Sequence, residues 1–130
     1  NAPVNQHACH YGPNQLFYFH NFSHPGRPEI QHYTLVHQNS GMCLDIPNAS
    51  TTAGVKVQQY PCNLGLNQDW DQSIYPPQPP GGIKFLQKRS SLCLSAPAPP
   101  SSTANSLPVE QNGCQNANNN LHQRWFIRWK

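Results

Sequence analysis

Residues 41 to 70 hold a dense set of side chains that can make directed polar contacts. They comprise three short stretches, GMCLDI (41–46), VQQYPC (57–62) and NQDW (67–70). A carboxylate only accepts hydrogen bonds, amide side chains both donate and accept them, and an aromatic ring offers a flat apolar face. These side chains can therefore bind a polar ligand, or they can tie loops of the chain to one another.

The composition favours hydrogen bonding over charge as the means of recognition. The chain has 130 residues, one domain's worth, and 36% of them are hydrophobic, which is enough for a modest core. Only 10% are charged, against about 25% in typical proteins. The net charge is +3 and no run of Lys or Arg exceeds two residues, so we expect no nucleic-acid partner.

Several features predict a secreted protein. The apolar runs span only a few residues, against the about 20 that a membrane span needs, so we expect no membrane span. The chain begins at Asn1 without a signal peptide or a starting Met, and we expect it to be a processed product, a fragment or an excerpt. Its five cysteines favour an oxidising compartment. The sequons at Asn21 and Asn48 are candidate glycosylation sites, which suits a secreted glycoprotein.

The local pattern predicts an all-β chain. Fourteen Pro and eight Gly are scattered through it, and no long segment keeps a helical apolar period. Short strands are predicted over 33–37, 56–60, 83–87 and 125–129. The Pro-rich run 75–82 resembles a linker between domains, but an internal repeat continues through it.

That repeat has a period near fifty residues and carries three patterns in a fixed order. The patterns are Cys-Leu-x at 43–45 and 93–95, Val-x-Gln-x-x-Cys at 4–9, 57–62 and 109–114, and x-Gln-x-aromatic at 14–17, 67–70 and 122–125. The sequence therefore predicts a single domain over 1–130, with two complete repeats, 31–80 and 81–130. The back half of a third repeat lies in 1–30.

The cysteines fit the same scheme. Pairing within each complete repeat gives Cys43–Cys62 and Cys93–Cys114, each closing a loop of about 20 residues worth about 3 kcal/mol in the chain-entropy model. Five cysteines permit other pairings, but only this scheme uses equivalent positions consistently. Cys9 is left over, and we expect it to be unpaired or bonded to a missing segment or another chain.

Taken together, Cys-Leu-Asp, Val-Gln-x-aromatic-x-Cys and Asn-Gln-x-Trp resemble the ricin-type (R-type) lectin domain, also called carbohydrate-binding module family 13, with its Gln-x-Trp repeat. The resemblance covers residues 2–125. It implies a β-trefoil, with three repeats around a pseudo-threefold axis, of which the first lacks its N-terminal half. It also implies that Phe17, Trp70 and Trp125, the last residues of the third pattern, pack in the core.

The resemblance implies a carbohydrate-binding site in the central repeat. A sugar offers hydroxyl groups and one apolar face, which suit polar side chains and an aromatic ring. By motif position, Asp45 would accept from two adjacent hydroxyls, Asn67 would bond a hydroxyl and Tyr60 would stack on the ring. Gln68 would steady Asp45 or contact the ligand, and Gln58 would support the site. The alternative is that Asp45 and Asn67 only tie loops together and Tyr60 is ordinary surface.

The last repeat departs from the motif at four positions. Ser95 replaces the Asp, Glu110 the Gln, Asn112 the aromatic and His122 the Asn, and only Gln123 stays. The charged anchor and the aromatic platform are both gone. We therefore expect no sugar site in the last repeat.

The first repeat keeps part of the motif. Asn14 and Gln15 match it, His7 takes the platform position and Asn5 the strand position. The carboxylate would belong to the missing half. These four residues form a possible incomplete second site, which would need a partner segment to complete it.

Catalysis and metal binding have little support in the sequence. The run His7-Ala8-Cys9-His10 suggests a metal site, but Cys9 is better used in a disulfide, so we expect neither metal nor cofactor. A glycosidase needs two carboxylates facing one bond. The only acidic residues close in sequence, Asp69 and Asp71, flank Trp70, and we predict no enzymatic activity.

The sequence therefore predicts a secreted lectin module that binds glycans, of galactose type or a related pyranose by family analogy. Two alternatives belong to other classes. One is a structural or assembly subunit whose trefoil is completed by a neighbouring chain. The other is the targeting module of a larger enzyme or toxin.

Overall fold

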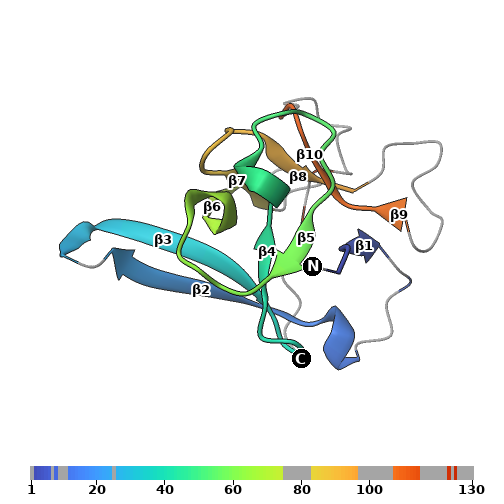
Figure 1. Cartoon of the computed structure of the whole chain (residues 1–130), viewed down its shortest axis with the longest axis horizontal. Coiled ribbons are helices and arrows are strands. Elements are labelled where there is room, and N and C mark those ends of the chain that lie inside the picture. Colours follow the sequence, from blue (N-terminus) through green and yellow to red (C-terminus); the bar gives the residue numbers. More distant parts are fainter. Residues whose placement is uncertain are drawn as a thin grey trace.

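The structure is a computed structural model that describes residues 2–6, 8, 12–24, 26–74, 83–96, 107–114, 123 and 125 (Figure 1). This part of the chain contains β-strands and three 3-10 helices but no α-helix, so the all-β prediction is confirmed. The strands are β1 (Asn5–Gln6), β2 (Phe17–His24), β3 (Arg27–His37), β4 (Cys43–Asp45), β5 (Gln58–Tyr60), β6 (Trp70–Ile74), β7 (Ile83–Gln87), β8 (Cys93–Ser95), β9 (Leu107–Pro108) and β10 (Glu110–Asn112). The 3-10 helices are η1 (Pro13–Gln15), η2 (Pro47–Ala49) and η3 (Leu66–Gln68).

The strands form two four-stranded antiparallel sheets and one separate pair. The sheet orders are β2-β3-β4-β5 and β10-β8-β7-β6, and β1 pairs with β9. The central and last repeats use the same register, because Asp45 lies opposite Gln58 where Ser95 lies opposite Glu110. Equivalent sequence positions are therefore equivalent in space.

Three valines form a hydrogen-bonded ring where the repeats meet. The backbone N–H of Val4 donates to the carbonyl of Val57 (3.1 Å), that of Val57 to Val109 (2.8 Å), and that of Val109 to Val4 (2.9 Å). Each valine begins one copy of the Val-x-Gln pattern. The flanking residues follow the same rotation, in the pairs Pro3 with Gln58, Lys56 with Glu110 and Pro108 with Asn5. This ring places the pseudo-threefold axis of the fold.

The core is built mainly from the central and last repeats. Trp70 is fully buried and its Nε1 donates to the carbonyl of Leu44 at 3.2 Å. Trp125, which is half-buried against the core, makes the equivalent bond to Leu94 at 3.0 Å, so the prediction that both tryptophans pack in the core is confirmed. The buried cluster consists of Leu35, Leu44, Ile46, Val57, Trp70, Phe85, Leu94 and Val109.

The prediction that Phe17 also packs in the core is wrong. Its side chain is 43% exposed, and its ring lies 5.0 Å from that of His37 across the β2–β3 pair. Each tryptophan lies over the Cys-Leu-x strand of its own repeat. The described part of the first repeat supplies no such strand to cover Phe17.

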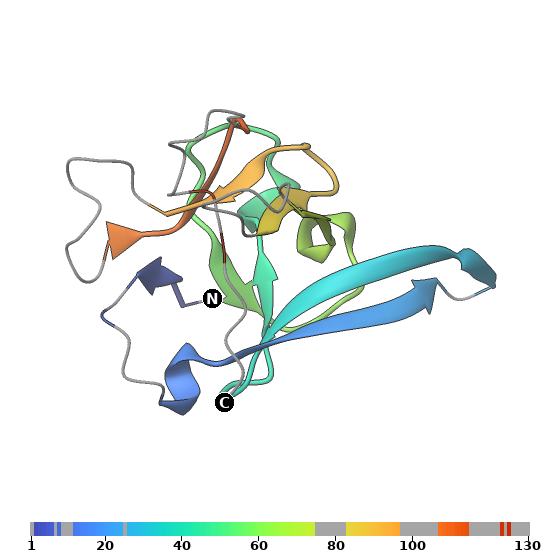
Figure 2. The ribbon, with the colours of Figure 1, turned by 180° about the vertical axis from the view of Figure 1, so that it is seen from behind.

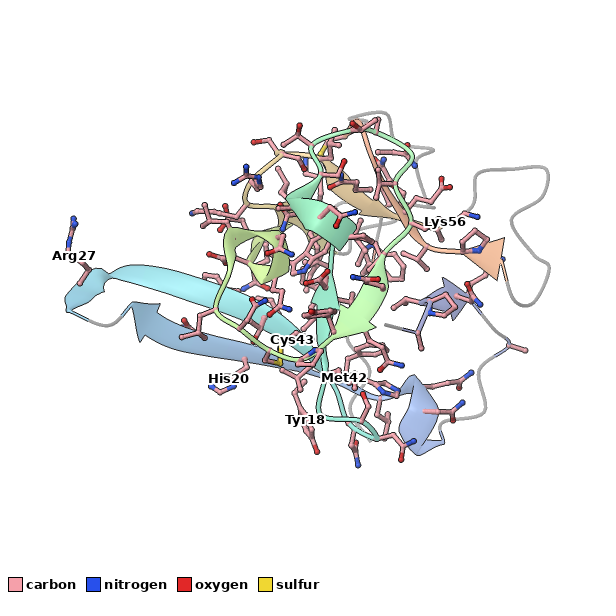
Figure 3. The ribbon with its side chains drawn as sticks, viewed as in Figure 1. Tyr18, His20, Arg27, Met42, Cys43 and Lys56 are labelled. Atoms are coloured by element: carbon pink, nitrogen blue, oxygen red, sulfur yellow. A yellow bond between two sulfur atoms is a disulfide. The ribbon has the colours of Figure 1, made fainter. Side chains whose placement is uncertain are left out.

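Strands β2 and β3 form a long two-stranded arm that extends away from the body of the domain (Figures 1 and 2). Arg27 lies at its far end, and His20 and Tyr18 lie nearer the body (Figure 3). No helix in the described residues is long and apolar enough to cross a membrane.

Both predicted disulfides are present. Cys43 is bonded to Cys62 and Cys93 to Cys114, with the same Cα–Cα distance of 5.1 Å. Each bond ties a Cys-Leu-x strand to the segment that follows a Val-x-Gln strand. The fifth cysteine, Cys9, which was expected to be unpaired or bonded elsewhere, lies outside the described residues.

Candidate functional site

Asp45 ends β4 and lies at the centre of a cluster of amide side chains. Its Oδ1 accepts from Gln58 Nε2 at 3.0 Å, and its Oδ2 accepts from Asn67 Nδ2 at 2.9 Å and from Gln68 Nε2 at 2.8 Å. The side chain is only 2% exposed. A carboxylate has about four acceptor positions, so the chain itself fills most of them.

The carboxylate fixes the orientation of the surrounding amides. Since a carboxylate only accepts, the amide atom that faces it must be nitrogen, and the amide oxygen points elsewhere. Asn67 uses both protons of its Nδ2, on Asp45 and on the carbonyl of Ile46 at 3.1 Å. Asn67 Oδ1 and Gln58 Oε1 have no hydrogen-bond partner among the described residues, and both side chains are half-buried. Two amide oxygens of the cluster are therefore without a partner among the described residues.

Gln68 is fully buried and its hydrogen-bonding capacity is used within the chain. Besides Asp45, its Nε2 donates to the carbonyl of Pro61 at 3.0 Å, and its Oε1 accepts from the backbone N–H of Asn63 at 2.9 Å. Of the two roles expected for Gln68, this arrangement corresponds to steadying Asp45. It also anchors the loop that follows β5.

Tyr60 lies on the same face of the β4–β5 pair as the polar cluster. In register, Asp45 lies opposite Gln58 and Cys43 lies opposite Tyr60. Residues two apart on a strand point to the same face, so Tyr60 and Gln58 share one. Tyr60 is 38% exposed, which leaves its ring accessible beside the amides.

The sequence patterns missed Asn63 and Gly65, which shape the site. The backbone N–H of Gly65 donates to Asn63 Oδ1 at 2.9 Å, which closes a local turn. A Cβ on Gly65 would lie 2.7 Å from Asn67 Oδ1 and 2.9 Å from Asn63 Oδ1. Only glycine fits without a shift of these side chains. The Asn-x-Gly spacing just before Asn67 is the sequence signal that could have indicated this turn.

The last repeat keeps the scaffold and loses the polar cluster. Gln123 is fully buried, and its Nε2 donates to Ser95 Oγ at 3.0 Å and to the carbonyl of Gly113 at 2.9 Å. Glu110 faces Ser95 and Asn112 faces Cys93. The scaffold bond of Gln123 is thus present although position 95 is a serine and position 112 an asparagine. His122 lies outside the described residues.

The first repeat keeps one scaffold bond. Gln15 Nε2 donates to the carbonyl of Ala8 at 2.8 Å, as the equivalent glutamines of the other repeats do to theirs. Asn5 and Asn14 are exposed, and His7 lies outside the described residues.

The two acidic residues that flank Trp70 are both engaged with the chain. Asp69 is buried and its Oδ1 accepts from the backbone N–H of Tyr33 at 3.0 Å, while Asp71 Oδ2 lies 3.5 Å from Lys88 Nζ at the surface. Neither is paired with Asp45 in the described contacts. Within the described ranges, no group of three or more His, Cys, Asp or Glu could hold a metal ion.

Both candidate glycosylation positions lie at the surface. Asn21 is exposed on β2, and Asn48 is exposed in η2 with a left-handed φ of 56°. Each side chain is therefore accessible for modification. Both positions stay predictions.

Comparison with known proteins identifies the fold. The family model for the ricin-type beta-trefoil lectin domain-like family matches residues 13–75, a segment that contains every predicted site residue of the central repeat. The designed three-fold symmetric protein ThreeFoil is 27% identical, with a TM-score of 0.72, over 92% of this chain and 79% of its own. The predicted β-trefoil and the resemblance to ricin-type lectins are confirmed.

A natural lectin has the same fold. The Polyporus squamosus lectin, solved with the human-type influenza-binding epitope Neu5Aca2-6Galb1-4GlcNAc bound, is 19% identical with a TM-score of 0.61. The match covers 88% of this chain and 35% of the lectin. The chain therefore corresponds to about a third of that lectin's length.

Proposed function

From a β-trefoil that resembles the ricin-type lectin domains, we propose that this chain is a carbohydrate-binding module that recognises glycans through its central repeat. The observation that carries the proposal is the arrangement of Gln58 and Asn67. Asp45 holds both amide nitrogens, and both amide oxygens stay unpaired among the described residues beside the exposed Tyr60. We further propose that residues 1–130 form one such domain.

Each part of this arrangement matches one part of a sugar. Hydroxyl groups would donate to Asn67 Oδ1 and to Gln58 Oε1, while the Tyr60 ring would stack on the apolar face of the pyranose. Asp45, at 2% exposure, would act mainly by holding the two amides in place. This differs from the direct contact with two hydroxyls that its motif position predicts. Amides that are already oriented lose less entropy when a ligand binds.

The proposed ligand is a galactose-type or related pyranose. This choice rests on the resemblance to ricin-type lectins, and the Polyporus lectin binds an epitope that includes a Gal unit. One monosaccharide offers little surface, so single-site affinity would be weak. Tight attachment to a glycan-bearing surface would need several copies of the module.

We propose that the module works outside the cell and without catalysis. Two disulfides within one small domain suit an oxidising compartment. Asp45 and Asp69 are buried and hydrogen-bonded to the chain itself, an arrangement that suits support rather than proton transfer to a substrate. A targeting role within a larger enzyme or toxin would use the same site.

A second candidate function is assembly. It is favoured by the exposure of Phe17, whose ring lies at the surface where the equivalent Trp70 is buried. In this case a neighbouring chain would supply the missing half of the first repeat and a partner for Cys9. Size-exclusion chromatography and intact mass, each with and without reductant, test it. A reductant-insensitive monomer contradicts it.

The lectin proposal is tested on a glycan array with three proteins. Wild type is compared with Asn67→Ala and with His122→Ala, which changes the equivalent position of the last repeat. Wild type should bind galactose-type glycans, Asn67→Ala should bind at least about tenfold more weakly, and His122→Ala should match wild type. Absence of binding to any glycan contradicts the proposal, and equal binding by Asn67→Ala contradicts the site.

A further inference from the structure

Large exposed hydrophobic side chains lie on the arm and within residues 60–66. Among the described residues, five such side chains are exposed: Phe17, Tyr18, Tyr60, Leu64 and Leu66. The first two lie on the arm formed by β2 and β3. The other three fall within residues 60–66, where Leu64 is 53% and Leu66 46% exposed. We call Tyr60, Leu64 and Leu66 the apolar rim.

Leu64 has an unfavourable backbone conformation for its side chain. Its φ is 61°, in the left-handed region that Gly and Asn adopt readily and that a residue such as Leu adopts rarely. The Leu side chain gains little burial in return, because more than half of it faces solvent. Strain of this kind is found preferentially at ligand-binding sites.

The loop that carries Leu64 and Leu66 runs next to the polar cluster. Leu64 and Leu66 flank Gly65, and a Cβ on Gly65 would lie 2.7 Å from Asn67 Oδ1. The Cys43–Cys62 disulfide fixes the start of this loop, and the bond from the backbone N–H of Asn63 to Gln68 fixes its middle. The backbone between the two leucines therefore runs next to the side-chain oxygen of Asn67.

We propose that the central site selects saccharides that carry an apolar substituent next to the hydroxyl bound by Asn67, with Leu64 and Leu66 covering that substituent. The inference rests on the proposed function and names its ligand class. Contact with the substituent removes apolar surface of both partners from water, which strengthens binding. A methyl in an N-acetyl group, a 6-deoxy methyl and an alkyl group at the anomeric carbon share this chemistry.

The test is a calorimetric titration with four ligands. These are methyl galactoside, methyl N-acetylgalactosaminide, methyl 6-deoxygalactoside and octyl galactoside, so the three substituted ligands separate the possible positions of the apolar group. Wild type should bind at least one substituted ligand about fivefold or more tightly than methyl galactoside. The Leu64→Asn variant, which suits the left-handed backbone, should reduce that preference to about twofold or less.

Two further variants make the result specific. Ser91→Asn places the same side chain at a position of the last repeat that also has a φ of 61°, and it should keep the wild-type preference. Leu66→Ala should lower the preference as Leu64→Asn does, and it replaces that variant if Leu64→Asn fails to fold by circular dichroism. Equal affinity for all four ligands, or a preference that persists in both leucine variants, overturns the inference but leaves carbohydrate binding intact. Absence of binding to all four ligands overturns the inference and the galactose-type ligand, and absence of binding to any glycan on the array overturns carbohydrate binding as well.

Discussion

Asp45 Oδ2 lies 2.8 Å from Gln68 Nε2, and both side chains are almost wholly buried. At the equivalent place in the last repeat, Ser95 Oγ lies 3.0 Å from Gln123 Nε2. The glutamine keeps its scaffold role in both repeats. In the central repeat the residue at this position is a carboxylate that also accepts from Gln58 and Asn67, so we infer that folding and binding depend on separable parts of the same cluster.

This separation predicts that Asp45→Ser gives a folded protein without carbohydrate binding. The serine hydroxyl would accept from Gln68 as Ser95 does from Gln123, but it would no longer hold Gln58 and Asn67. By contrast, Asp45→Asn would place an NH₂ group among donors and should destabilise the domain by about 1–3 kcal/mol. Urea unfolding of both variants measures this difference. If the Asp45→Ser variant lost as much stability as the Asp45→Asn variant, the result would contradict the proposed scaffold role of Gln68.

Gly65→Ala should disturb Asn67. The new methyl would lie 2.7 Å from Asn67 Oδ1, so the amide must move, and we expect weaker glycan binding and a loss of about 1–3 kcal/mol in stability. Gly113→Ala in the last repeat is the matched control, since nothing lies within 4 Å of its Cβ position. Titration and thermal unfolding of both variants check the prediction. Equal effects of the two substitutions would refute it.

The two disulfides should differ in their effect on binding. Replacing both cysteines of either pair with alanine should cost about 2–4 kcal/mol of stability. Loss of Cys93–Cys114 should leave binding intact under folding conditions, whereas loss of Cys43–Cys62 should also weaken it, because that bond fixes the loop beside Asn67. Binding assays below the melting temperature of each variant make the comparison. If only the variant without Cys93–Cys114 lost binding, the site would lie in the last repeat, which would contradict the prediction.

The core aromatics should show a graded cost of truncation. Trp70→Ala should cost about 3–5 kcal/mol, because Trp70 is fully buried and hydrogen-bonded to Leu44. Phe17→Ala should cost less than about 1 kcal/mol, as is usual for exposed positions, since its side chain is 43% exposed. Denaturant unfolding measures both. A large cost for Phe17→Ala would show that its ring is covered in solution.

The sequence predicted what the repeat itself determines. Equivalent positions within repeats gave the disulfides Cys43–Cys62 and Cys93–Cys114, and the motif resemblance gave the β-trefoil and the buried Trp70. The exposure of Phe17 could not be predicted in this way, because burial depends on which segment covers a side chain as well as on its motif position. For Phe17 the described chain offers no covering strand.

The candidate site shows a second limit of motif reasoning. The motif named Asp45 and Asn67 as residues able to bind hydroxyls, but it does not say how much of their hydrogen-bonding capacity the chain itself uses. Three amide groups donate to the Asp45 carboxylate. We therefore propose that Asp45 positions these amides rather than contacting the sugar itself. The closeness of Gly65 to Asn67 depends on the path of the loop, which no local pattern determines.

The most direct test of binding in the central repeat is a ¹H–¹⁵N NMR titration of the protein with methyl galactoside. We predict that the side-chain amide signals of Asn67 and Gln58 shift together with the backbone signal of Tyr60 as ligand is added. The side-chain signal of Gln123 should stay in place. Shifts centred on Gln123 and Ser95, or no shifts at all at saturating ligand, would contradict the account.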